Sequence, residues 1–292
     1  MLQSLVPGVE TDPVQARRGL QQAFESEPVQ FLLAFMELAR RGETGPGMDY
    51  VAGLLTTKTA TFDFLSNPVL CNFADAVSLA KRILIADPGL DVKLAQHARE
   101  SKWLDGDSDV YLIRLLEVLS QISSGNRILP SLMQMLRRED PRIKSKVALL
   151  IGRVNKDAYW VESYLSEADP RVRANVVEAL YGDASPNSVR ILRQALRDVH
   201  HRVVANAWVG LYLAGETDAA EGLMRMSQSQ KEWFQAASAW GMGRCADEGF
   251  IPTLQELGKS KYPTVRRCAI RALVAIQGKN QARRSTKSTS NT

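Results

Sequence analysis

Hydrophobic positions in the second half of the chain recur at intervals of about 31 residues. The apolar residue that opens each segment stands at steps of 29, 31, 31 and 31, at Ile143, Val172, Val203, Phe234 and Val265. The fourth position after each of these markers is small or apolar, and the eighth is apolar. Because such positions share one face of an α-helix, each segment predicts an amphipathic helix. We expect these helices to begin near residues 141, 170, 201, 232 and 263.

A second series of helical segments alternates with the first. It comprises ILPSLMQMLRRE, DAYWVESYLSEA, PNSVRILRQALRD, TDAAEGLMRMSQS and GFIPTLQELGKS. Turn signals such as Asp140-Pro141 and Asp169-Pro170 separate the two series. Proline is tolerated at the first helical position, because the amide hydrogen it lacks has no partner there, and the preceding Asp can cap the helix. One helix pair cannot bury its own apolar stripe, so the pattern predicts stacked pairs that share a core.

The period is lost towards the N-terminus. DVYLIRLLEVLSQIS fits as one more helix of the first series, and NPVLCNFADAVSLAKRILIAD predicts a long helix that starts at Asn67-Pro68. EPVQFLLAFMELARRG and MDYVAGLLTTK predict further amphipathic helices. Since no segment alternates like a strand, the chain is predicted to be all-α. We expect three parts: irregular helices over 1–105, regular helix pairs over 106–277, and a disordered basic tail over 278–292.

Several of the marked helices resemble the HEAT-repeat superfamily, in its short PBS-lyase-like form. The residues that carry the resemblance are VRANVVEALYG (172–182), FQAASAWGMG (234–243) and VRRCAIRAL (265–273), which are similar to V-R-x-x-A-A-x-A-L-G. The resemblance implies a right-handed α-solenoid of stacked HEAT-like helix pairs. It also implies that Arg173 and Arg266 pair with acidic residues of neighbouring repeats. It does not choose between scaffolds, adaptors, nucleic-acid binders and enzymes.

Charge and cysteine usage indicate the class of partner and the cellular compartment. The net charge is +5, but residues 278–292 hold four basic residues and no acid, which leaves +1 for the remainder. The folded part therefore lacks the broad positive field of a typical nucleic-acid binder. No apolar run is long enough for a membrane span, and the N-terminus does not resemble a secretory signal. Cys71, Cys245 and Cys268 are scattered and are predicted to be reduced thiols, so we expect a cytoplasmic protein.

Candidate catalytic and metal-binding patterns are sparse. The chain has no G-x-x-x-x-G-K-[ST] phosphate loop and no His-Glu dipeptide, which iron-dependent HEAT enzymes repeat along the stack. Adjacent residues on a helix point about 100° apart, so His200-His201 is predicted to cap or cover a helix and not to hold a metal. Gly241–Cys245, GMGRC, predicts close helix packing. No catalytic residue, metal or cofactor is predicted.

The second helix of each HEAT pair usually lines the concave, binding face of the solenoid, which indicates where a partner would bind. The candidate partner-binding residues point away from the predicted core: Lys146, Leu149, Asn175, Glu178, Asn206, Val209, Trp240, Arg267 and Arg271. Trp240 is the predicted aromatic anchor. The alternative is that adjacent repeats bury Leu149 and Val209. Four other aromatic residues are predicted to lie in the core: Trp208, Trp233, Tyr181 and Tyr212.

The sequence thus favours a non-catalytic scaffold or adaptor that binds a protein or peptide on its concave face. The alternative is a nucleic-acid binder, including a base-modifying enzyme similar to the alkylpurine glycosylases built from HEAT-like repeats. These combine a basic concave face with Trp, Arg and Asp around an extruded base. Trp208, Trp240 and Arg244 supply some of these residue types, but no motif aligns. The similarity to phycobilin lyases is confined to the repeat.

Overall fold

The computed structural model describes residues 12–56, 58–100, 108–122, 126–138, 140–155 and 158–289. Within these ranges every regular element is a helix, and no strand occurs. The chain divides into two compact units, Met1–Asn155 (unit 1) and Lys156–Thr292 (unit 2). This division differs from the boundary expected at residue 105, which falls in a stretch, 101–107, outside the described residues. None of the described helices combines the length and the apolar character that crossing a membrane requires.

Unit 1 contains the helices that precede the regular period and the first of the marked helices. They are α2 (Pro13–Ser26), α3 (Pro28–Arg40), α4 (Pro46–Leu55), α5 (Thr59–Ser66), α6 (Phe73–Ala86), α7 (Leu90–Glu100), α8 (Ser108–Ile122), η1 (Asn126–Ile128), α9 (Leu129–Met135) and α10 (Pro141–Asn155). Large side chains such as Phe35, Phe64 and Leu115 are fully buried between them. Unit 1 therefore has a hydrophobic core of its own.

Helix α6 begins at Phe73, so the start predicted at Asn67-Pro68 was wrong. Asn72 is the N-cap: its side chain accepts a hydrogen bond from the amide of Asp75 at 3.0 Å. The Asn67 side chain instead accepts the amide hydrogen of Val69 at 2.9 Å. An Asn side chain that bonds two residues ahead makes a turn as readily as a cap. The Asn-Pro signal therefore marks the turn after α5.

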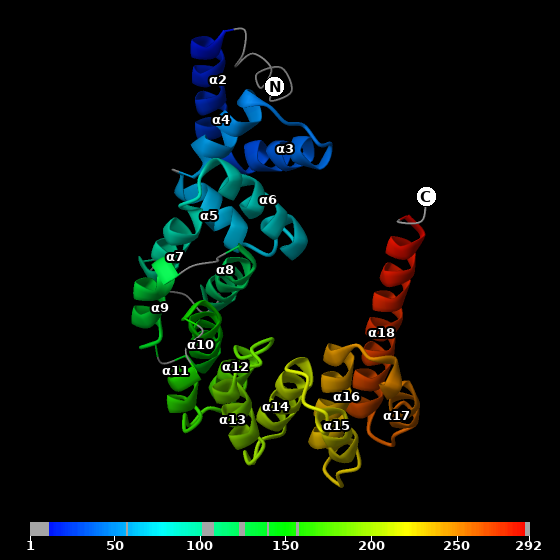
Figure 1. The fold of residues 1–292 in the computed structure, drawn as a ribbon. Coiled ribbons are helices and arrows are strands. Elements are labelled where there is room, and N and C mark those ends of the chain that lie inside the picture. Colours follow the sequence, from blue (N-terminus) through cyan, green and yellow to red (C-terminus); the bar gives the residue numbers. More distant parts are fainter. Residues whose placement is uncertain are drawn as a thin grey trace. The chain divides into compact units, whose positions relative to one another are not determined.

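Unit 2 is a stack of helix pairs (Figure 1). Its helices are α11 (Ala158–Ser163), α12 (Pro170–Glu178), α13 (Pro186–Ala195), α14 (His201–Leu213), α15 (Ala219–Ser227), α16 (Glu232–Cys245), η2 (Glu248–Phe250), α17 (Ile251–Leu257) and α18 (Pro263–Thr289). Helix α14 packs against α12 and α16, and α16 packs against α18, while α13, α15 and α17 cover them. The all-α solenoid of helix pairs and the five predicted helix starts are confirmed.

The turns before these helices contain the predicted caps. The Asp169 carboxylate accepts the amide hydrogen of Arg171 at 2.7 Å, and Pro170 occupies the first turn of α12. At the start of α14 a histidine takes the place of the aspartate: His200 Nδ1 accepts the amide hydrogen of Arg202 at 3.3 Å. The predicted capping role of this histidine is confirmed. Unpaired amide groups at a helix start need such an acceptor.

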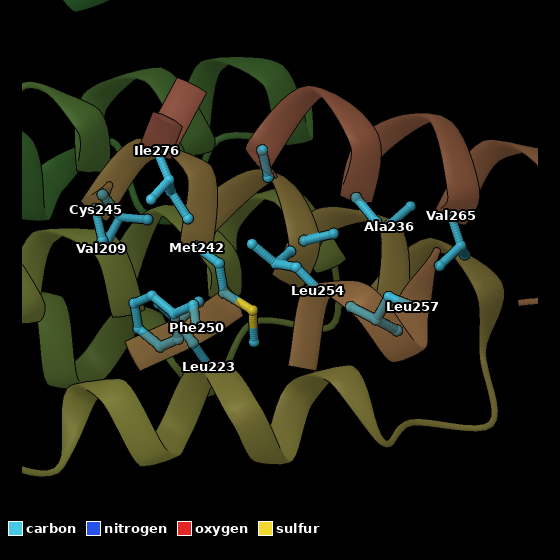
Figure 2. Close-up of a cluster of buried hydrophobic side chains, with 13 residues drawn as sticks. Val209, Leu223, Ala236, Met242, Cys245, Phe250, Leu254, Leu257, Val265 and Ile276 are labelled. Carbon is cyan, nitrogen blue, oxygen red and sulfur yellow. The ribbon is translucent and has the colours of Figure 1, made fainter. Parts of the chain in front are cut away.

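The core of unit 2 lies between its two series of helices (Figure 2). It includes Val209 of α14, Leu223 of α15, Met242 of α16 and Ile276 of α18. The GMGRC segment packs closely, as predicted: a Cβ at Gly243 would lie 2.9 Å from the Cα of Ala272 on α18. Trp208, Tyr181 and Tyr212 pack against this core and are partly buried, in agreement with their predicted positions.

Arg173 and Arg266 occupy equivalent positions in α12 and α18 and fasten each helix to the preceding turn. Arg173 Nη1 donates to the carbonyl oxygens of Glu167 and Ala168 at 2.8 and 3.0 Å. Arg266 Nη1 donates in the same way to the carbonyls of Ser260 and Lys261, at 2.7 and 3.0 Å. Arg173 also pairs with Asp198, an acid of the next repeat, as predicted. For Arg266, backbone carbonyls take the place of the expected acidic partner.

Helix α18 extends through most of the segment predicted to be a disordered tail. It continues to Thr289, and residues 290–292 lie outside the described residues. After Gly278 the chain contains Lys, Gln, Ala and Arg, which are good helix formers, and no proline that would stop the helix. Among the α18 side chains that the structure describes, the last buried one is Ile276. The residues that follow it, up to Lys279, are exposed.

Candidate functional site

Unit 2 contains a pocket of about 240 Å³ on the side formed by α12, α14, α16 and α18. We call it the Trp pocket, and ten residues line it: Glu178, His201, Arg202, Ala205, Asn206, Trp233, Ala236, Ala237, Trp240 and Cys268. One of these residues comes from α12, four from α14, four from α16 and one from α18. The pocket therefore spans four neighbouring helices of the stack.

Two tryptophans of α16 define the pocket. Trp233 and Trp240 are seven residues apart, close to two helical turns, so both side chains lie on the same face of the helix. Trp233 is 57% exposed and Trp240 is 38% exposed. The prediction that Trp233 lies in the core was wrong, because this residue precedes the buried residues of α16, which begin at Ala236. Its spacing from Trp240 was the sequence signal that could have placed it correctly.

Small residues make room beside the tryptophans. Ala205 of α14 and Ala236 and Ala237 of α16 are buried, and Cys268 of α18 is half-buried. A larger side chain at any of these positions would occupy part of the space. The pocket thus exists because these short side chains stand two or three residues after the markers of α14, α16 and α18. The two tryptophans stand on either side of Ala236 and Ala237 along α16.

Asn206 lies in the wall of the pocket, but its amide is already used. Its Nδ2 donates to the carbonyl oxygen of Ala174 at 2.6 Å, which connects α14 to α12, and the side chain is buried. A buried amide that loses such a partner is costly. This residue therefore positions the α14 wall, in addition to any contact with a ligand.

His201 extends the aromatic wall. Its ring stacks on that of His200, with centroids 4.3 Å apart, and its centroid lies 6.2 Å from that of Trp233. Burial lowers the pKa of His201 to about 4, and the neighbouring His200 and Arg202 act in the same direction. Burial also lowers the pKa of His200. The His201 ring is therefore neutral at pH 7 and presents an aromatic surface to the pocket.

The structure brings together some of the predicted binding residues and separates others. Glu178, Asn206 and Trp240 line the Trp pocket. Asn175 of α12 is half-buried in the same unit, and Arg267 and Arg271 are exposed on α18. Their role in binding stays a prediction. Sequence reasoning did not select the other seven pocket residues as binding residues: His201, Arg202, Ala205, Trp233, Ala236, Ala237 and Cys268.

Val209 is not available to a partner, which corrects the prediction. Its side chain is 0% exposed and belongs to the core of unit 2. A Cβ at Gly241 would lie 3.2 Å from Val209 Cγ2, so the glycine allows α16 to approach closely enough to cover the valine. The sixth residue after the marker is therefore exposed in α16, where it is Trp240, but buried in α14, where it is Val209.

Leu149 and Lys146 are also outside the pocket. Both belong to α10 and hence to unit 1. Leu149 is 8% exposed, because it is packed in the core, so it is a second correction. Lys146 Nζ forms an ion pair with Glu117 Oε1 of α8 at 2.7 Å. These two residues follow the repeat pattern in sequence but do not contribute to the Trp pocket.

The described residues contain no group of three or more His, Cys, Asp or Glu side chains placed to hold a metal ion. Within the pocket, burial raises the pKa of the Cys268 thiol, while Arg271 and Arg267 lower it by a smaller amount. A thiol with a raised pKa is a poor nucleophile at neutral pH. The groups that line the pocket are therefore better suited to binding than to covalent chemistry.

No protein-family model matches the chain, and a search of curated proteins gave no match. Among solved structures, human deoxyhypusine hydroxylase in complex with glycerol is similar over 93% of this chain and 99% of its own, with 15% identity and a TM-score of 0.38. Kap121p bound to Pho4p is similar over 94% of this chain, with 15% identity and a TM-score of 0.40. The chain spans only 33% of Kap121p. These likenesses concern helical architecture and carry no argument about activity or partners.

Proposed function

We propose that unit 2 is a non-catalytic interaction module that binds a protein or peptide segment at the Trp pocket. The observation that carries the proposal is the pair of exposed tryptophans, Trp233 and Trp240, on one face of α16 beside a concave space. Tryptophan has a large apolar surface and is among the residues most enriched at binding hot spots. Neither ring is needed to fill the core, so the exposure of both is best explained by a partner.

The size of the pocket supports a side-chain anchor as its occupant. Pockets for drug-sized molecules and cofactors have volumes of roughly 300–1,000 Å³. The Trp pocket, at about 240 Å³, is smaller, which suits one large side chain of a partner. The rest of the partner would then lie across the neighbouring second helices, as in groove binding by peptides.

The chemistry of the pocket supports a non-catalytic role. His201 is neutral at pH 7 and stacked between other rings. Cys268 has a raised pKa. General acid–base catalysis is favoured when the pKa of the catalytic group lies near the working pH, and neither group meets this condition.

The proposal is tested by selecting peptides from a random display library against the full chain and measuring their affinities by calorimetry. Trp240→Ala is expected to weaken binding about 30-fold, since an aromatic anchor contributes about 2 kcal/mol. Tyr159→Ala is the matched control, because Tyr159 is an exposed aromatic residue of α11 that does not line the pocket. It should leave affinity unchanged.

Thermal melting of the same variants separates binding from folding. A partly exposed Trp240 should tolerate alanine with a small loss of stability, whereas a buried Trp would lose about 3–5 kcal/mol. Selected peptides that bind wild type and Trp240→Ala equally well would overturn the proposal. A Trp240→Ala variant that no longer folds would also overturn it, because the ring would then belong to the core.

A further inference from the structure

We infer that the ligand of the Trp pocket is an acidic peptide segment, in which Asp or Glu residues flank one aromatic or large aliphatic anchor. The inference rests on the proposed function and adds the chemistry of the partner. It is carried by the charge around the pocket, which is positive although the chain without residues 278–292 has a net charge of only +1.

Four exposed arginines lie on three of the helices that form the pocket: Arg202, Arg244, Arg267 and Arg271. Arg202 lines the pocket itself. Arg244 follows Trp240 by four residues and therefore lies on the same face of α16, one turn further along. Arg271 occupies in α18 the repeat position that Trp240 occupies in α16. Arg267 precedes Arg271 by four residues, beside the pocket residue Cys268.

These four arginines form no ion pair with any other residue in the described part of the chain. Several arginines elsewhere in unit 2 are paired, among them Arg171 with Asp169 at 3.0 Å and Arg190 with Glu162 at 2.7 Å. On the helices that cover the core, Arg193 pairs with two acids at once. Four arginines that form no ion pair in the described part of the chain therefore lie on the helices that form the Trp pocket.

Charge of one sign around an apolar pocket selects a ligand of the opposite sign. Complementary charge at the rim speeds association and excludes partners of like charge, while the buried anchor provides most of the affinity. Arginine is suited to this role, because its planar guanidinium donates two parallel hydrogen bonds to a carboxylate. A peptide with carboxylates on both sides of its anchor would meet Arg202 near the Trp233 end of the pocket and Arg244 one turn beyond Trp240, with the α18 pair beside it.

The distribution of aromatic residues favours a peptide over a single-stranded nucleic acid. Proteins that bind single strands place aromatic side chains where successive bases can stack. In unit 2 both exposed tryptophans lie on α16. The equivalent positions of α14 hold Arg202 and the buried Val209, and those of α18 hold Thr264 and Arg271. The aromatic residues thus mark a single anchor site and do not form a track.

The test uses the full chain and fluorescence anisotropy with four probes of matched length. The first is a fluorescein-labelled peptide with one Trp between runs of Asp and Glu, and the second has Asn and Gln in place of the acids. The third has Ser in place of Trp, and the fourth is an oligothymidylate. We expect the first peptide to bind about tenfold tighter than the second or third, and its affinity to fall as salt is added.

Two charge variants and a control locate the effect. Arg267→Glu combined with Arg271→Glu should weaken binding of the acidic peptide about tenfold or more. The milder pair Arg267→Gln and Arg271→Gln should act in the same direction and guards against a folding defect. Arg197→Glu is the matched control, because Arg197 is exposed in unit 2 after α13 and does not line the pocket. It should leave the affinity unchanged.

Each other outcome overturns the inference in a distinguishable way. If the Asn/Gln peptide binds as tightly as the acidic peptide and its binding still requires Trp240, the acidic preference is wrong but the proposed function stands. If the binding of every peptide, including the library-selected ones, is unaffected by Trp240→Ala, the acidic preference and the proposed function are both wrong. If the oligothymidylate binds more tightly than every peptide and requires Arg267 and Arg271, the ligand is a nucleic acid and the inference is overturned.

Discussion

Arg173 of α12 and Asp198, in the turn before α14, form two parallel hydrogen bonds. Arg173 Nε donates to Asp198 Oδ2 at 2.7 Å, and Nη2 donates to Oδ1 at 3.0 Å. The side chains are 14% and 11% exposed. Asp198 also accepts the amide hydrogen of His200 at 2.7 Å. One carboxylate therefore joins two repeats and fixes the start of α14, and with it the position of the wall that carries His201 and Arg202.

Arg173→Met should destabilise the chain by about 3 kcal/mol, because it leaves the Asp198 carboxylate largely buried without its partner. Burial raises the pKa of Asp198, but the hydrogen bonds from Arg173 and His200 outweigh it and hold the pKa below its ordinary value. Arg171→Met is the control: its pair with Asp169 is exposed, so its loss should cost under about 1 kcal/mol. Urea unfolding, followed by circular dichroism, measures the loss of stability in both variants. Equal losses would show that the pair does not hold the repeats together.

The arrangement of helices follows from local features of the sequence, which is why it could be predicted. Apolar stripes at helical spacing fixed where α10, α12, α14, α16 and α18 lie, and Asp-Pro turns fixed where two of them begin. The start of α6 was misplaced because an Asn side chain serves turns and caps alike. The end of α18 was misplaced because a polar composition permits an exposed helix as well as disorder.

The candidate site was predicted only in part, because it depends on distances between helices. Trp240 was correctly placed on the exposed face, but Val209, at the same repeat position of α14, is covered where Gly241 lets α16 approach. The sequence gives the angle of a residue around its helix and not the distance to the next helix. Trp233 could have been found from its spacing with Trp240, whereas the contribution of Cys268 depends on how α18 packs against α16.

Gly243→Ala is expected to destabilise unit 2 by about 1–3 kcal/mol through overpacking. A Cβ at this position would lie 2.8 Å from the Cβ and 2.9 Å from the Cα of Ala272, so α16 and α18 would have to separate. Gly53→Ala in α4 is the matched control, since nothing lies within 4 Å of its Cβ position. There the better helix propensity of alanine should raise stability by up to about 1 kcal/mol. Urea unfolding measures the free energy of unfolding of both variants. If Gly243→Ala raised it as Gly53→Ala does, the close packing of α16 on α18 would be contradicted.

Cys268 should be the first of the three cysteines to react with a thiol reagent such as DTNB. It is half-buried in the pocket, whereas Cys71 and Cys245 are buried, and burial raises their pKa values to about 11 and about 12. Since the thiolate is the reactive form, both should stay unreactive until the chain unfolds. Cys268→Ser should abolish the early reaction, and a saturating pocket-binding peptide should slow it in the wild type. Simultaneous reaction of all three thiols would contradict this order.

The stability of unit 2 should fall as the pH decreases from about 6.5 to about 4, in part because of His201. The folded-state pKa of His201 is about 4, lowered by burial, while an unfolded histidine has a pKa of about 6.5. Between these values the unfolded chain binds a proton that the folded chain does not, so protonation favours unfolding. Above about pH 6.5 both states are neutral, and the contribution of His201 no longer changes with pH.

His201→Phe tests this cause, because phenylalanine keeps an aromatic ring against His200 and Trp233 but cannot take up a proton. We expect a smaller drop in melting temperature over this pH range than in the wild type, with similar values near pH 7. His200→Asn serves as the companion variant: asparagine retains the cap of α14 and removes the second titrating ring. An unchanged pH profile in His201→Phe would show that the carboxylates whose pKa values are lowered in the folded state, such as Asp198, cause the acid sensitivity instead. These carboxylates lose their stabilising effect at lower pH, as they become protonated, so the part of the profile between pH values of about 5 and 6.5 distinguishes the histidine from the acids.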